Sequence, residues 1–155
     1  MSLSTPTIAV AESITGGLLA SSFIEESGAS SYFKGGIIAY SPEIKTALLG
    51  VKLKDVQRDY GVNEETAKSM ALGIARLMRA DIGISTTGFA EPYDGHDAQA
   101  YIGICKVGSG EGEIPTMQII HIINPGTGRN EFRAHIVEII RSFLCNYTFS
   151  QKFTS

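Results

Sequence analysis

Short apolar runs alternate with segments of helical periodicity in the first half of this chain, and this alternation constrains the fold most. Residues 7–11 form a β-prone run, which we interpret as a strand buried on both faces. An amphipathic pattern from Gly16 to about Glu26 follows and predicts a helix. Strands that alternate with helices favour parallel pairing through right-handed crossovers.

The same patterns continue along the chain. The Gly-rich residues 108–112 are expected to join the last two strands as an antiparallel hairpin. We therefore predict an α/β fold, a three-layer α/β/α domain with a mixed, mostly parallel five-stranded sheet. The remaining strands are predicted at 32–40, 81–87, 99–107 and 116–123, and the remaining helices at 41–50, at 52–61 (with a loop), from 63 to about 79, and from 127 or 130 to about 145.

The length of 155 residues fits one domain, with a core at about 7–146 and a frayed tail at 147–155. A net charge of −3 argues against sequence-independent binding of nucleic acid. No apolar run approaches the roughly 20 residues of a membrane span, and no signal peptide is recognisable, so a cytoplasmic location is expected. Met1 to Leu3 fit a native start and an added leader equally well. Cys105 and Cys145 form no metal-binding pattern, and Cys105 is expected to be a buried thiol.

Ligands of open α/β sheets bind outside the carboxyl ends of the strands. The first loop at that edge is Glu12-Ser13-Ile14-Thr15-Gly16-Gly17, where two glycines allow close backbone approach and the next helix offers N–H groups to an anion. The second is Thr86-Thr87-Gly88. A Ser or Thr before a helix is more often a cap, and a glycine pair is more often a tight turn. Neither the Walker loop nor the dinucleotide fingerprint is present.

A serine nucleophile needs a base, and none of the three histidines is well placed to serve. His121 and His135 are expected to be structural, and His96 is a weak candidate for ligand contact. The alternative activator is a lysine of lowered pKa, helped by a tyrosine hydroxyl. If the first two strands are neighbours, Tyr40 and Lys45 lie at the same edge of the sheet as Ser13. An ordinary solvated lysine is the competing interpretation of Lys45.

The segment Ala11-Glu12-Ser13-Ile14-Thr15-Gly16-Gly17 resembles the A-E-S-x-T-G-G signature of the CinA C-terminal domain family. Further matches follow in the same order, and the resemblance extends from about Ile8 to Leu144. These matches are Gly28-Ala29-Ser30-Ser31-Tyr32-Phe33-Lys34-Gly35-Gly36, Tyr40-Ser41, Lys45, Leu49-Gly50-Val51, Gly61-Val62-Asn63-Glu64-Glu65, Met70-Ala71-Leu72-Gly73, Ala80-Asp81, Thr87-Gly88, Arg129 and Arg133.

Members of this family include amidohydrolases that convert nicotinamide mononucleotide to nicotinic acid mononucleotide and ammonia. The resemblance implies a nucleophile at Ser13, activated by Lys45 and Tyr40, without a metal or organic cofactor. It places Thr87 in the same pocket and Arg129 on the substrate, at its phosphate. Main-chain N–H groups at 15–17 would form the oxyanion hole. The expected substrate-binding residues are Glu12, Thr15, Gly16, Gly17, Thr87, Gly88 and Arg129.

The sequence departs from the family pattern after Thr87-Gly88. The family has A-G-P-x-G-G and then K-P-V-G-x-V, whereas here Glu91 replaces the first glycine, the Lys-Pro is missing, and the loop is about two residues shorter. The family also usually has a helix before the first strand. A catalytically weak nucleotide-binding or regulatory module is therefore the second hypothesis, and a structural subunit is the third. The family tends to self-associate, so a homo-oligomer is expected, supported by the strands of Ile102/Ile104 and Ile119/Ile122.

Overall fold

The computed structural model describes residues 5–108 and 110–152. Strands and helices alternate in the predicted order. The strands are β1 (Ile8–Glu12), β2 (Phe33–Ile38), β3 (Ile82–Phe89), β4 (Gln99–Lys106) and β5 (Thr116–Ile123). The α-helices are α1 (Leu18–Ile24), α2 (Pro42–Leu49), α3 (Leu53–Gln57), α4 (Glu64–Met78) and α5 (Arg129–Lys152), and short 3-10 turns are η1 (Ala29–Ser31) and η2 (Arg58–Gly61).

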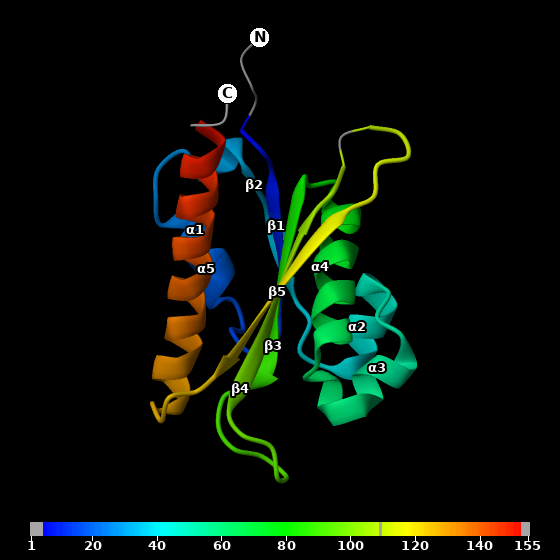
Figure 1. Cartoon of the computed structure of the whole chain (residues 1–155), viewed down its shortest axis with the longest axis vertical. Coiled ribbons are helices and arrows are strands. Elements are labelled where there is room, and N and C mark those ends of the chain that lie inside the picture. The colour runs from blue at the N-terminus through cyan, green and yellow to red at the C-terminus, as the bar shows by residue number, and fades with distance from the viewer. Residues whose placement is uncertain (1–4, 109, 153–155) are drawn as a thin grey trace.

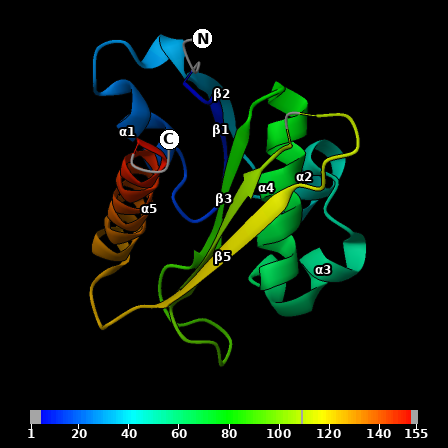
Figure 2. The same ribbon diagram turned by 45° about the horizontal axis from the view of Figure 1, so that its top comes forward.

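The five strands form one sheet in the order β2-β1-β3-β4-β5. β1 pairs in parallel with β2 and β3, whereas β4 pairs antiparallel with β3 and β5. Four strands therefore run in one direction and β4 alone is reversed. Helices α1 and α5 cover one face of the sheet, and α2, α3 and α4 lie on the other (Figures 1 and 2). The predicted three-layer domain with a mixed, mostly parallel sheet is confirmed.

Several helix ends follow from the capping residues in the sequence. The Ser41 side chain accepts a hydrogen bond from the Ile44 N–H, and Gly50 ends the same helix with a left-handed backbone. The Asn63 side chain caps α4 in the same way. The predicted boundaries of these two helices are therefore confirmed.

Strand β1 is buried along its whole length. Its side chains alternate between two apolar clusters, with Val10 facing α1 and α5, and Ala9 and Ala11 facing α4. The predicted burial of this strand on both faces is confirmed. Ile102 and Ile104 are also buried inside the fold, whereas Ile119 and Ile122 on the edge strand β5 are partly exposed.

Helix α5 is longer than the sequence patterns indicated. The predicted end at about Cys145 and the frayed tail from 147 are wrong, because the helix continues to Lys152. Residues 146–152 contain neither glycine nor proline, so no local signal stops the helix. Residues 153–155 and Met1 to Leu3 lie outside the described residues. Within the described residues, no helix has the length and apolar character needed to span a membrane.

Candidate active site

A cavity of about 420 Å³ opens at the carboxyl ends of β1 and β3, within the usual range for small-molecule sites. It is formed where the β1–α1 turn, the start of α2, η2, the loop after β3 and the first residue of α5 converge. The residues that line it are Ser13, Ile14, Tyr40, Lys45, Tyr60, Val62, Thr87, Gly88, Phe89, Ala90, Glu91, Tyr93 and Arg129.

Ser13 and Lys45 meet inside this cavity. The pairing of β1 with β2 brings the two segments together, and Lys45 Nζ donates a hydrogen bond to Ser13 Oγ at 3.0 Å. The Lys45 side chain lies on the first turns of α2 and the residue is only 4% exposed. Burial disfavours the ammonium form and lowers the pKa of Lys45 to about 8. The amine is therefore suited to take up a proton near neutral pH.

Tyr40 contacts Lys45 through its main chain. Lys45 Nζ donates a second hydrogen bond to the Tyr40 carbonyl oxygen at 3.2 Å. The Tyr40 side chain is 66% exposed at the cavity mouth. The contact with the lysine therefore differs from the expected one, which involved the tyrosine hydroxyl.

Glu12 faces away from the cavity. Its Oε1 accepts hydrogen bonds from Thr15 Oγ1 at 2.7 Å, Leu19 N–H at 2.8 Å and Gly17 N–H at 3.2 Å, and its Oε2 accepts one from Ala20 N–H at 3.0 Å. The carboxylate thus occupies the amino end of α1, where unpaired N–H groups attract anions. The prediction that this end offers its N–H groups to a ligand is wrong, and the structure gives Glu12 a structural contact instead of a substrate contact.

The other residues of the β1–α1 turn support its backbone on the side away from the cavity. Thr15 is fully buried, and its hydroxyl also lies 2.8 Å from Thr86 Oγ1. Gly16 and Gly17 have backbone φ angles of 53° and 105°, which residues other than glycine adopt only with strain. Arg133 donates hydrogen bonds to the Ile14 carbonyl oxygen at 2.9 Å and to the Thr15 carbonyl oxygen at 3.1 Å. None of these three predicted binding residues, Thr15, Gly16 and Gly17, lines the cavity.

Thr87 and Gly88 line the cavity at the end of β3. Thr87 Oγ1 donates a hydrogen bond to the Gly61 carbonyl oxygen at 2.9 Å, which ties the strand to η2. A Cβ atom on Gly88 would lie 2.4 Å from the Gln99 carbonyl oxygen, so only glycine permits this approach of β4.

Arg129 lines the cavity, and its charge is already paired. Its Nη1 is 2.9 Å from Glu91 Oε1, and both side chains are at least half exposed. The residue that departs from the family pattern therefore contacts the residue expected to hold the substrate phosphate.

An aromatic cluster forms one wall and was missed by the sequence reasoning. The rings of Tyr60, Phe89 and Tyr93 lie 5.3 to 6.1 Å apart between centroids. The Tyr60 hydroxyl donates a hydrogen bond to Asp94, which joins η2 to the loop after β3. Tyr60 has a φ of 57°, which is unusual for a residue other than glycine and typical of functional loops. Nothing in the spacing of these aromatic residues predicts that they meet.

The histidines take no part in the lining of this cavity. His96 stacks on Phe89 with centroids 5.1 Å apart and supports the aromatic cluster from behind. His121 stacks on Tyr101 and bonds Gln99, consistent with a structural role. Cys105 is a buried free thiol, as predicted, and burial raises its pKa. Among the described residues, no cluster of His, Cys, Asp or Glu could hold a metal ion.

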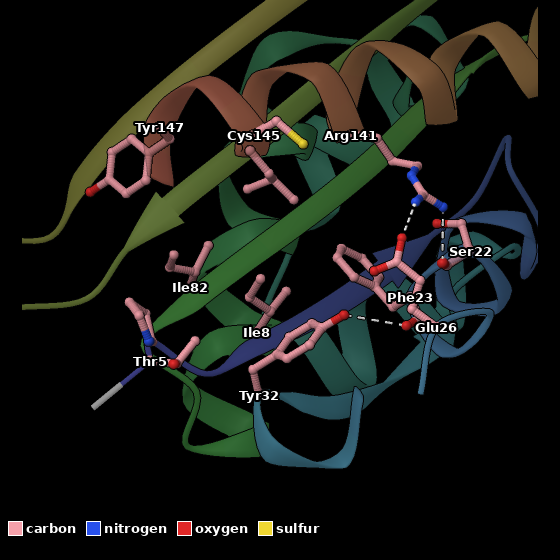
Figure 3. Close-up of a pocket in the computed structure, with 12 residues that line it drawn as sticks. Thr5, Ile8, Ser22, Phe23, Glu26, Tyr32, Ile82, Arg141, Cys145 and Tyr147 are labelled. Atoms are coloured by element: carbon pink, nitrogen blue, oxygen red, sulfur yellow. Dashed lines mark hydrogen bonds and ion pairs between the residues drawn. The ribbon is translucent and has the colours of Figure 1, made fainter. Parts of the chain in front are cut away.

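A second cavity of about 320 Å³ lies at the opposite end of the sheet, between α1 and α5 (Figure 3). Its lining is mostly apolar and includes Ile8, Phe23 and Cys145. Arg141 crosses it and is paired with Glu26 at 3.2 Å, and it also bonds the Ser22 carbonyl oxygen. No serine–lysine pair occurs among the residues that line it. The first cavity is therefore the candidate active site.

Over most of its length, the chain is similar to one known protein family. The profile of the CinA C-terminal domain matches residues 2–145. A putative competence-damage inducible protein of Halothermothrix orenii is 42% identical over 73% of this chain, and one of Clostridium kluyveri is 49% identical over 74%. The chain matches only 28% of the length of each of these two relatives.

Solved structures show the same fold. The competence or damage-inducible protein of Enterobacter asburiae superposes with a TM-score of 0.78 at 26% identity, covering 90% of this chain and 85% of that one. The competence damage-inducible protein A of Klebsiella pneumoniae gives a TM-score of 0.80 at 24% identity, with coverage of 90% and 84%. The names of these proteins do not state a reaction.

Proposed function

Since the chain belongs to the CinA C-terminal domain family, we propose that it is a cytoplasmic amidohydrolase of pyridine nucleotides. Its substrate is nicotinamide mononucleotide, and its products are nicotinic acid mononucleotide and ammonia. The observation that carries this proposal is the 3.0 Å hydrogen bond between Lys45 Nζ and Ser13 Oγ inside a ligand-sized cavity. A serine hydroxyl beside a lysine of lowered pKa is a recognised nucleophile–base pair.

The reaction begins when the neutral Lys45 amine takes the hydroxyl proton of Ser13 as Oγ bonds to the carboxamide carbon. The Lys45 ammonium then gives this proton to the amide nitrogen, the C–N bond breaks, and ammonia leaves. The nicotinoyl group stays on Ser13 as an ester. A water molecule loses a proton to Lys45 and attacks the ester carbon. The C–Oγ bond breaks, and Lys45 returns the proton to Ser13.

Each tetrahedral intermediate carries an oxyanion that needs N–H donors. Among the expected donors, the Gly17 N–H is already bonded to Glu12. Thr15 and Gly16 do not line the cavity, so we assign this role to the main-chain N–H group of Ile14, the turn residue next to Ser13 that does line it. Arg133 holds this turn through its carbonyl oxygens and so fixes the direction of the N–H groups.

The remaining contacts suit a planar ring and its sugar phosphate. Aromatic side chains such as Tyr60 and Tyr93 provide faces on which a pyridine ring can stack. Arg129 is the basic lining residue other than Lys45, and it would bind the phosphate. Thr87 also lines the cavity and would contact the substrate. We also retain the proposal that the protein is a homo-oligomer.

A second candidate function is a catalytically weak nucleotide-binding or regulatory module. The altered loop after β3 motivates this alternative, because its Glu91 pairs with the arginine that would hold the substrate in position for catalysis. The two functions make different predictions for Ser13, since a binding module does not need the hydroxyl for its activity.

The decisive experiment measures ammonia release from a panel of amidated pyridine nucleotides. We expect Ser13→Ala to lower kcat/KM by at least about 1,000-fold, because the nucleophile is removed. Ser21→Ala is the matched control, since Ser21 is an exposed serine on the adjoining helix, and it should leave the rate unchanged. Binding of nicotinamide mononucleotide without any ammonia release would reject the hydrolase and support the binding module.

A further inference from the structure

The ion pair at the cavity mouth bears on substrate choice. Resting on the amidohydrolase function proposed above, we propose that Glu91 competes with the substrate phosphate for Arg129. The site therefore binds a pyridine nucleoside carboxamide about as well as the corresponding 5′-phosphate. Glu91 is then a specificity-determining residue of this cavity.

The geometry places the carboxylate where an anionic ligand group would bind. Both Glu91 and Arg129 line the cavity, and Glu91 Oε1 lies 2.9 Å from Arg129 Nη1. A carboxylate and a phosphate use the same guanidinium N–H groups. A phosphate that approaches Arg129 must displace Glu91 or share the guanidinium with it.

The neighbouring arginine does not replace Arg129. The Arg133 guanidinium donates hydrogen bonds to the carbonyl oxygens of Ile14 and Thr15 and to Asn130 Oδ1. These contacts hold the turn that carries Ser13. A phosphate contact at Arg133 would therefore disturb the nucleophile that it is meant to serve.

The other charged groups of this region are hydrogen-bonded elsewhere. Asp94, on the same loop as Glu91, accepts the Tyr60 hydroxyl and so lies beside the aromatic wall. Lys45, the other basic residue of the cavity lining, is bonded to Ser13 at the reacting end. The region around Arg129 thus has a carboxylate already paired with its arginine, which favours a ligand without added negative charge.

The expected effect is moderate, because both members of the ion pair are exposed. An exposed ion pair of this kind changes a binding affinity by up to about fivefold. The repulsion between Glu91 and a doubly charged phosphate raises the expected change in affinity to about tenfold. The interaction should weaken with added salt.

The test measures binding by calorimetry in a Ser13→Ala background, which prevents turnover. Nicotinamide mononucleotide and nicotinamide riboside are the two probes. We expect similar affinities for both in the parent protein. Glu91→Gln should raise the affinity for the mononucleotide about tenfold and leave the affinity for the riboside unchanged. Glu138→Gln, at an exposed position of α5, is the matched control and should change neither.

A double variant assigns the effect to Arg129. In Arg129→Gln the additional Glu91→Gln change should produce a smaller gain for the mononucleotide than it does when Arg129 is present, because only the direct repulsion by Glu91 is then removed. A parent protein that prefers the mononucleotide tenfold or more would overturn the proposal, as would an equal gain for both probes in Glu91→Gln. If the expected binding pattern is found but the protein that retains Ser13 releases no ammonia, the hydrolase function is rejected and the role of Glu91 in ligand choice stands.

Discussion

The two buried charges beside the Ser13 turn are held in opposite ways. Glu12, behind the turn, is 1% exposed and accepts hydrogen bonds from one hydroxyl and three main-chain N–H groups. Lys45, on the cavity side, is 4% exposed and donates to one hydroxyl and one carbonyl oxygen. Buried charges are tolerated when hydrogen bonds replace water, so the carboxylate is well compensated and the ammonium is not.

This difference separates the structural side of the turn from the chemical side. Behind the turn, Glu12 and Arg133 fix the backbone by satisfying its N–H and carbonyl groups. On the cavity side, the poorly compensated Lys45 has a pKa lowered to about 8. Sites that perform proton transfer need a titratable group with a shifted pKa, even though burying such a group lowers the stability of the fold. Substitutions on the two sides should therefore affect activity and stability differently.

The largest effect after loss of the nucleophile is expected for Lys45→Met, which should lower kcat/KM by about 100- to 10,000-fold because the general base is lost. The same change should raise the free energy of unfolding at pH 7 by about 2–3 kcal/mol, because it removes a charge that the fold buries at a cost. Chemical denaturation and ammonia release measure the two quantities. Lys54→Met, an exposed change on α3, is the control. A variant that loses activity and stability together would remove the distinction between the two sides.

The pH dependence follows from the lowered pKa of Lys45, which burial moves from 10.5 to about 8. The reaction needs the neutral amine, so kcat/KM should rise with pH and level off above about 8. Between pH 8 and 10.5 the unfolded chain binds more protons than the folded chain, so stability should also rise with pH across this window. Both slopes should be absent from Lys45→Met. An activity profile that is flat from pH 6 to 9 would argue against Lys45 as the base.

Glu12→Gln is expected to act mainly on stability. The amide keeps the shape of the side chain but replaces one acceptor oxygen with a donor that faces main-chain N–H groups. We expect the free energy of unfolding to fall by about 2–3 kcal/mol. The folded fraction should retain activity within about tenfold. Thermal unfolding compared with Glu138→Gln tests this, and a loss of activity as large as that of Ser13→Ala would place Glu12 on the chemical side.

The smallest effect is expected for Tyr40→Phe. This change keeps the carbonyl oxygen that accepts the Lys45 hydrogen bond and removes only an exposed hydroxyl. We expect kcat/KM to fall by less than about fivefold, with the melting temperature unchanged. A loss of about 100-fold or more would show that the hydroxyl takes part in proton transfer, as the sequence suggested.

The fold was largely predictable because local signals marked its elements. Ser41, Gly50 and Asn63 are capping residues that the structure uses at the helix ends where they were expected. The end of α5 was placed too early, because no glycine or proline follows Cys145 before residue 152 and the helix continues through this segment.

The candidate site was predictable only in part. The meeting of Ser13 with Lys45 follows from the pairing of two neighbouring strands and could be anticipated. The role of Glu12 could not, because the sequence does not show that its carboxylate turns back onto α1. The aromatic wall combines η2 with the loop after β3, and contact between two loops depends on backbone conformations that periodicity does not reveal.

The two hydrogen bonds from Arg133 to the turn join residues that are 119 and 118 positions apart in the chain. A ribosome makes the Ser13 turn before the helix that carries Arg133, because synthesis runs from the amino end. The nucleophile is therefore made more than 100 residues before Arg133, and the contacts that orient its backbone form only when α5 docks. The proposed hydrolytic activity thus reports on completion of the domain, and a nascent chain that stalls before α5 would be catalytically silent.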